Sequence, residues 1–273
     1  MNLDEFCSSD QWSMLIAAAE HSKLAAALGG FLITAIALYL KGDVRESVHT
    51  LALFSSAVLV LVLSAFVSGT VVGTVVPEGA QRDGICAIAW AQGALATSML
   101  AAGTAALFGG LGWLLAGHAV EKLAAPEAAP SNGYRFLTGL GSWLTFAAAL
   151  TTTLLLSETS IDYLHFAFHG RPERWLVGLV VLGAAAVVLT SFVLVLRAPG
   201  EQSSLGALKV ATVCVVVLGV GASWLSMTLA RFPKDWLTSP APPIVLMVLA
   251  LTFALPAVIA GAICFSAPSA RGM

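Results

Sequence analysis

Seven long apolar segments constrain this chain more than any other feature of its sequence. A helix that crosses the hydrocarbon core of a bilayer needs about 20 mostly apolar residues. The segments that fit cover about residues 24–40, 50–76, 85–117, 136–156, 175–196, 205–230 and 243–265. Backbone polar groups in lipid need partners within the protein, and an α-helix supplies them within each segment. The sequence therefore predicts an all-α integral membrane protein, a bundle of seven transmembrane helices.

The composition excludes a water-soluble protein. Only 10% of the residues are charged and 58% are hydrophobic, whereas a soluble domain carries about 25% charged residues. The main partner of this surface is the lipid bilayer. A net charge of −2, with no cluster of Lys or Arg, predicts no nucleic-acid partner. The segments between the spans are too short for a soluble domain, so residues 1–273 are expected to form a single transmembrane domain.

The residues before the first span predict a short N-terminal interfacial helix, residues 10–22, with Ser9 or Asp10 as its cap. Lys23 and Glu20 are expected at the level of the lipid headgroups, where long side chains reach water. The first twelve residues carry acids and no positive charge, so we expect no cleavable signal peptide.

The basic residues give a weak prediction of orientation. Seven spans place the two termini on opposite sides of the membrane. The loops on the N-terminal side carry six Lys and Arg residues, and those on the other side carry seven. Because basic loops stay in the cytoplasm, we expect a multi-pass protein of the cell (cytoplasmic) membrane with its N-terminus out and its C-terminus in.

The four cysteines form no recognisable motif. Cys214 and Cys264 lie within apolar runs, which favours buried and unreactive thiols. Cys7 and Cys86 lie near segment ends that are expected on the same side. A disulfide between them would require an oxidising compartment; the sequence favours two unbonded cysteines and leaves the disulfide as the alternative.

Small residues are the expected means of helix packing. Gly69 and Gly73 form a GxxxG pattern in the second span, and the third span is rich in glycine and alanine. Small residues let helix backbones approach closely in a membrane. We expect these to pack within the bundle, and the alternative is an interface with a second copy or another subunit. Pro256 is predicted to kink the seventh span.

One short stretch, SETSIDYLHFAFHGRPERW at residues 157–175, carries the most distinctive polar pattern. In a helix, its Glu158, Asp162, His165 and His169 fall within an arc of roughly 60°. Such a stripe is typical of a solvated helix face, a metal site or a proton-transfer path. Two histidines four residues apart can bind one cation such as zinc. Eleven residues of helix span about 16 Å, so at most three of the four groups converge on one ion.

Three functions remain open on the sequence alone. The spans carry few ionisable groups at membrane depth, and phosphate-binding and serine-hydrolase motifs are absent. This favours a non-enzymatic membrane component: a complex subunit, a permeation element, or a binder of lipid or a small molecule. The first alternative is a metal-dependent enzyme or metal handler that uses the stripe. The second is a secondary transporter, which the lack of a buried carboxylate makes the least favoured.

Overall fold

The computed structural model describes residues 7–9, 12–41, 48–79, 81–123, 132–168, 172–196, 205–229, 231 and 242–266. Its long helices are α1 (Met14–Lys41), α2 (Val48–Val72), α3 (Arg82–Leu123), α4 (Asn132–Ala167), α5 (Arg174–Leu196) and α6 (Leu205–Leu229). The last span consists of α8 (Pro242–Leu249), the π-helical turn η2 (Ala250–Ala254) and α9 (Leu255–Ser266). Within this part of the chain, seven helices are long and apolar enough to cross a membrane. The predicted seven-helix fold of a multi-pass membrane protein is confirmed.

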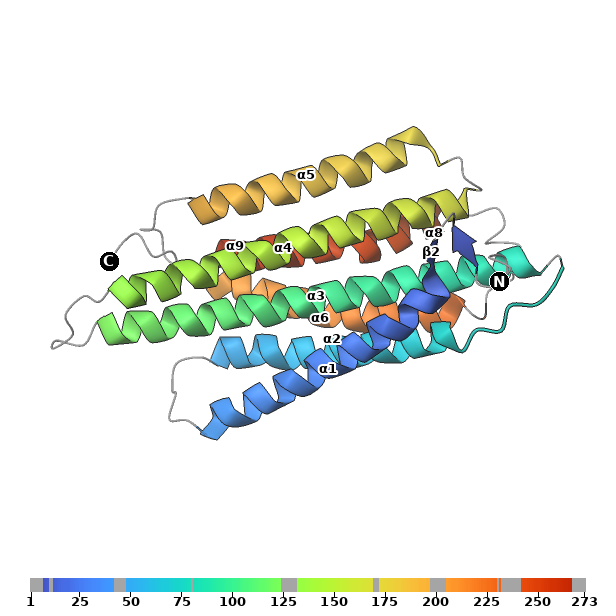
Figure 1. The fold of residues 1–273 in the computed structure, drawn as a ribbon. Coiled ribbons are helices and arrows are strands. Elements are labelled where there is room, and N and C mark those ends of the chain that lie inside the picture. The colour runs from blue at the N-terminus through green and yellow to red at the C-terminus, as the bar shows by residue number, and fades with distance from the viewer. Residues whose placement is uncertain are drawn as a thin grey trace.

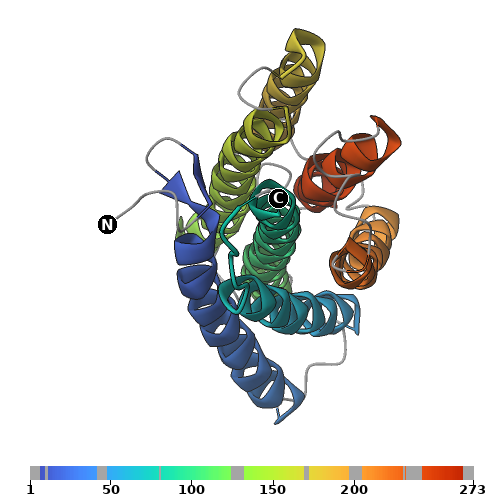
Figure 2. The same cartoon turned by 90° about the vertical axis from the view of Figure 1, so that its right-hand side faces the viewer.

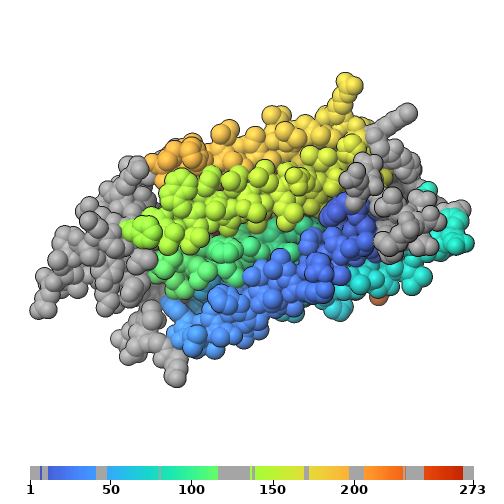
Figure 3. Space-filling model, in the orientation of Figure 1, coloured from blue at the N-terminus to red at the C-terminus, as the bar shows by residue number. Residues whose placement is uncertain are grey.

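Helix α3 occupies the centre of the bundle. The helices run side by side (Figure 1), and the view along their length places α3 among α1, α2, α4, α6 and α9 (Figure 2). In its most apolar window 94% of the residues are buried, against 17% in the windows of α1 and α5. On one face α1 and α4 flank a strip of α3, and α5 forms the upper edge (Figure 3). Five helices therefore share α3 as their packing partner, while most of the surface of α1 and α5 is not buried inside the bundle.

The glycines of α3 receive side chains from its neighbours, as the sequence predicted. A Cβ atom would collide with Met14 of α1 at Gly93, with Leu61 of α2 at Gly103, with Ile263 of α9 at Gly109, and with Phe54 of α2 at Gly110. The hollows that these glycines leave are filled by large apolar side chains, so the gain is dispersion contact with atoms at close range.

The contact between α3 and α4 is tighter still, because two backbones meet there. A Cβ atom at Gly112 would lie 2.9 Å from the carbonyl oxygen of Gly141, and one at Gly141 would lie 2.8 Å from the carbonyl oxygen of Gly112. Thr145 of α4, one turn further, donates its hydroxyl to the Gly141 carbonyl at 2.9 Å. Neither position accepts a side chain unless the two helices separate.

The GxxxG pattern of α2 packs differently from the prediction. A Cβ atom at Gly69 would meet nothing within 4 Å, and one at Gly73 would meet only carbonyl oxygens of its own helix. Both glycines are exposed. The expectation that this pair packs within the bundle is therefore wrong, because α2 turns the face that bears Ser64, Val67 and Val71 toward the protein instead.

The last span is irregular at the predicted place. The π-helical turn η2 ends two residues before Pro256. A proline cannot donate a backbone hydrogen bond and crowds the turn before it, and a wider turn relieves this crowding. Phe253 of η2 lies where a Cβ atom of Gly183 on α5 would come within 2.8 Å of its ring. The irregular turn thus supplies a contact that holds α5 against the bundle.

The N-terminus differs from the prediction. Strands β1 (Ser8–Ser9) and β2 (Trp12–Ser13) pair as an antiparallel hairpin, with Ser8 opposite Ser13 and Ser9 opposite Trp12. Helix α1 begins at Met14 and runs unbroken into the first span. The separate interfacial helix over residues 10–22 is not confirmed, and the Ser13 hydroxyl, at 3.5 Å from the backbone nitrogen of Ile16, takes the capping place assigned to Ser9 or Asp10.

Two further boundaries matter for the site. Helix α2 ends at Val72, although the sequence predicted a span to residue 76, so the chain is already irregular over residues 73–79 before α3 begins at Arg82. Helix α4 continues to Ala167, although the predicted span ended at 156. Glu158, Asp162 and His165 of the polar stripe therefore lie in the last turns of α4, a helix long and apolar enough to cross a membrane.

The backbone contact between α3 and α4 gives a stability prediction. Replacing Gly141 by alanine forces the Gly112 carbonyl away and should lower the free energy of unfolding by about 1–3 kcal/mol. Thermal or detergent unfolding of the purified protein measures this. The control is Gly139→Ala on the same helix, where a Cβ atom meets nothing within 4 Å; it should be neutral or slightly stabilising. Equal stability of the two variants would contradict the close approach.

Candidate functional site

The predicted stripe lies on the surface of α4. Glu158 and His165 are exposed and Asp162 is half-buried, whereas His169 lies outside the described residues. Among the residues that the structure describes, no three His, Cys, Asp or Glu side chains are grouped closely enough to hold a metal ion. Because His169 belongs to the predicted set, the metal site is neither confirmed nor excluded, and it stays a prediction.

The opposite face of the same helix carries the contacts to the protein. Tyr163, Leu164 and Ala167 are buried there. Phe166 stacks on Trp90 of α3, with ring centroids 5.6 Å apart and an angle of 17° between the planes. Aromatic packing thus anchors the end of α4, and its polar residues lie on the face that points away from the protein.

Around this anchor, a cluster closes one end of the bundle. We call it the cap cluster: Cys7, Met14, Ala18, Val71, Cys86 and Trp90, with Trp12, Leu15, Val76 and Phe166 packed against it. The ring of Trp12 meets that of Trp90 edge-on at 5.3 Å. The indole nitrogen of Trp90 donates a hydrogen bond of 2.7 Å to the backbone oxygen of Cys7. These contacts hold the hairpin over the end of α3.

A covalent bond reinforces the cap cluster. Cys7 and Cys86 form a disulfide, with their Cα atoms 5.3 Å apart, so the expectation of two unbonded cysteines is wrong. The sequence could not show that the hairpin turns Cys7 back over the first turns of α3. Cys264 is a buried free thiol, as predicted, and Cys214 is a free thiol that is half-buried rather than buried.

A pocket of about 480 Å³ lies beside the cap cluster. Its walls come from three places: the first turn of α1, the end of α2 with the segment that follows it, and the start of α3. The lining residues are Leu15, Ile16, Val72, Thr74, Val76, Pro77, Glu78 and Arg82. Its volume is within the ~300–1,000 Å³ usual for small-molecule sites. Leu15 and Val76 belong to both structures, so the cap cluster forms one wall of the pocket.

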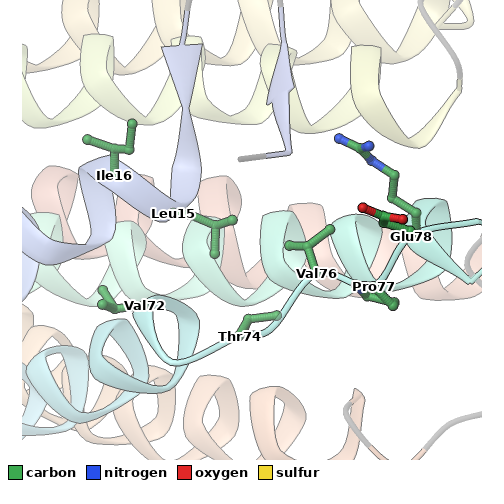
Figure 4. A pocket seen from close by; sticks show the side chains of 8 residues that line it. Leu15, Ile16, Val72, Thr74, Val76, Pro77 and Glu78 are labelled. Carbon is green, nitrogen blue, oxygen red and sulfur yellow. The ribbon is translucent and has the colours of Figure 1, made fainter. Parts of the chain in front are cut away.

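The pocket is polarised along the direction of the helices. Figure 4 shows Leu15, Ile16 and Val72 at one end, beside the turns of α1 and α2, and Pro77 and Glu78 at the other. The apolar end therefore lies at the depth of the spanning helices, and the charged end lies beyond the last turn of α2. The pocket could not be predicted from the sequence, because its wall between α2 and α3 has no helical periodicity.

The disulfide joins the start of the hairpin, which leads into α1, to the α3 wall of this pocket. Cys86 lies four residues, about one helical turn, after Arg82 on α3. On the other wall, the buried side chain of Met14 fills the hollow at Gly93 and immediately precedes Leu15. The distance between α1 and α3 at the pocket is thus fixed by one covalent bond and one close-packed side chain.

Deeper in the bundle, polar side chains join α1, α2, α3 and α6 instead of lining a pocket. The Gln92 amide donates to the Ser226 carbonyl at 2.8 Å, and the Ser64 hydroxyl donates to the Ala96 carbonyl at 2.8 Å. Ser22 of α1 donates to the Ala65 carbonyl at 3.1 Å. In membrane proteins such bonds are worth about 0.6 kcal/mol on average, so they align the helices and indicate no chemistry of their own.

His21 is a polar residue of this layer that the sequence analysis missed. Its Nδ1 lies 3.3 Å from the hydroxyl of Thr97, which donates its own proton to the Gly93 carbonyl at 2.9 Å. The contact between the imidazole and the hydroxyl joins α1 to α3, and the histidine tautomer sets which of the two donates. The spacing of His21 from Ala18 and Ala25, both buried, is the helical signal that would have placed it against α3.

No family model, curated protein or solved structure matches this chain. The function must therefore be argued from the residues themselves. Chemically, the pocket offers an apolar surface beside the turns of α1 and α2 and two charged side chains at its other end, and this arrangement suits the binding of an amphiphile.

The metal-site prediction has a direct test. If the stripe binds zinc or a similar ion, the purified protein carries about one equivalent of metal, and the double variant His165→Ala/His169→Ala loses it. Elemental mass spectrometry of both proteins measures this. The control is His49→Ala, whose imidazole lies at the start of α2. Metal-free wild-type protein after purification without chelator would contradict the prediction.

The disulfide predicts a simple labelling pattern. In the unfolded, unreduced protein, a thiol-alkylating reagent should label Cys214 and Cys264 and leave Cys7 and Cys86 unlabelled; after reduction all four should react. Peptide mass spectrometry reads each site. Labelling of Cys86 without prior reduction, in protein taken directly from its native membrane, would contradict the bond.

Proposed function

We propose that this protein is a non-enzymatic component of a cell membrane that binds an amphiphilic molecule of the bilayer in the pocket between α1, α2 and α3. The observation that carries the proposal is the polarity of the pocket. Ile16 of α1 and Val72 of α2 are about half exposed, at 53% and 46%, and in the proposal they face the lipid tails. Glu78 lies beyond the end of α2. A lipid in the adjacent leaflet would have its tails beside the apolar end of the pocket and its headgroup beside the charged end.

The packing of α3 supports binding over permeation. A polar path through a bundle needs space between the helices, and the centre here is filled by the 94% buried apolar window of α3. Large side chains such as Phe54 and Met14 occupy the hollows at its glycines. Coupled transport gains no support either, because the buried polar layer consists of hydroxyls, one amide and one imidazole that bond to other helices.

The disulfide supports the predicted orientation. Disulfides persist in oxidising compartments and are rare where thiols are kept reduced. The Cys7–Cys86 bond lies at the N-terminal end of α1. We therefore propose that this end, with the pocket, faces the outside of the cell membrane and that the C-terminus lies in the cytoplasm.

Partner proteins remain a secondary proposal. The exposed glycines of α2, Gly69 and Gly73, offer a surface on which another helix could approach closely. Association with a second copy or with another subunit would be compatible with lipid binding, because Val72 and the pocket lie at the end of the same helix.

Blocking the pocket tests the proposed function. Val72→Trp places an indole in the apolar end of the pocket. Because the space is only about 480 Å³, this variant should retain several-fold less bound lipid than the wild type. Native mass spectrometry of the purified protein counts retained lipids. The matched control is Val62→Trp on the same helix, at a valine that is 51% exposed and outside the pocket. Equal lipid retention by the two variants would contradict the proposal.

A further inference from the structure

Two side chains of opposite charge border the outer end of the pocket. Glu78 is exposed and Arg82 is half-buried, and both line the cavity. Gly79 between them has a φ of 92°, a conformation that favours glycine, and its carbonyl accepts a hydrogen bond of 3.1 Å from the Arg82 nitrogen. This turn brings the end of the segment that follows α2 and the start of α3 to the same cavity.

Neither charge is neutralised by an ion pair in the described part of the chain. The ion pair found there joins Lys23 and Glu20, which lie on exposed turns of α1 with 2.7 Å between nitrogen and oxygen. The carboxylate of Glu78 and the guanidinium of Arg82 both border the cavity, at the level where the headgroups of the outer leaflet would lie.

The pair restricts the headgroup that fits. An anionic headgroup would meet Arg82 favourably and Glu78 unfavourably, and a cationic one would do the reverse. A headgroup that carries a phosphate and an ammonium satisfies both. Arg presents a planar fork of donors that matches a phosphate, and a carboxylate accepts hydrogen bonds from or pairs with an ammonium. Such contacts are stronger at a partly buried site than in open water.

We propose that the pocket binds a zwitterionic glycerophospholipid, with its phosphate on Arg82, its ammonium group on Glu78 and the first part of its acyl chains along Ile16 and Val72. This inference rests on the proposed function and adds the headgroup chemistry to it. A cavity of about 480 Å³ encloses the headgroup region, and the remaining chain length stays in the bilayer beside α1 and α2.

The experiment compares two lipids with identical chains, phosphatidylcholine and phosphatidylglycerol, on the disulfide-intact protein in mild detergent. Native mass spectrometry measures the affinity of each. We expect wild type to prefer phosphatidylcholine by about ten-fold, the size expected for one ion pair between the choline ammonium and Glu78 at this site. Arg82→Gln should weaken both lipids by about ten-fold. Glu78→Gln should weaken phosphatidylcholine and strengthen phosphatidylglycerol, which abolishes the preference.

Two variants serve as matched controls. Asp83→Asn removes an exposed carboxylate one residue after Arg82 and outside the pocket lining, and Arg231→Gln removes an exposed guanidinium after the end of α6. Both should keep the wild-type preference. Unfolding temperatures of all four variants establish that each is folded, and the exposed or half-buried positions of these side chains favour this.

The outcomes separate the headgroup inference from the proposed function. Lipid bound with the same preference by wild type, Glu78→Gln and Arg82→Gln would overturn the headgroup inference and leave pocket binding intact. Undiminished lipid binding by Val72→Trp would overturn the proposed function itself. A third arm uses phosphocholine without chains, which should not compete at concentrations equal to the lipid; equal competition would overturn the choice of a lipid as the source of the headgroup.

Discussion

The close approach of helices to α3 is the constraint on which the rest of this structure depends. In a bilayer, apolar side chains gain little by leaving lipid for protein, so association depends on the fit of surfaces and on hydrogen bonds between helices. Glycines along α3 provide that fit. Gly93 admits a side chain of α1, Gly110 one of α2 and Gly109 one of α9, and Gly112 meets the backbone of α4. Because α3 has no side chain at these glycines, its neighbours can pack closely against it.

The end of the molecule that carries the pocket extends the same packing. Met14 fills the hollow at Gly93, and this fixes the start of α1 beside α3. The hairpin before Met14 then lies over Trp90, and the disulfide to Cys86 closes the arrangement. The pocket is what remains between these fixed walls and the irregular segment after α2. Its charged end lies beyond the end of α2 at Val72, where Glu78 and the first residue of α3, Arg82, border the cavity.

Much of the fold could be predicted from the sequence, and little of the candidate site. Apolar length alone predicted the seven spans, because the bilayer imposes one repeated requirement on each of them. The disulfide was only the alternative on the sequence, because Cys7 and Cys86 lie 79 residues apart and no local pattern encodes their meeting. The hairpin was missed because its residues were predicted to begin a helix. Glu78 and Arg82 lie in a segment without periodicity, so only the folded chain brings them to one cavity. The stripe that the sequence singled out has its Glu158 and His165 exposed on the surface of α4.

The most direct test is lipid retention by the wild-type protein before and after reduction of its disulfide. Native mass spectrometry would measure bound phospholipid, and circular dichroism would monitor helix content. If the Cys7–Cys86 bond holds the walls of the pocket, reduction lowers lipid occupancy several-fold while the helices persist, and the reductant has no effect on the variant Cys7→Ser/Cys86→Ser. Unchanged occupancy after complete reduction would contradict the dependence of the pocket on the bond that joins its walls.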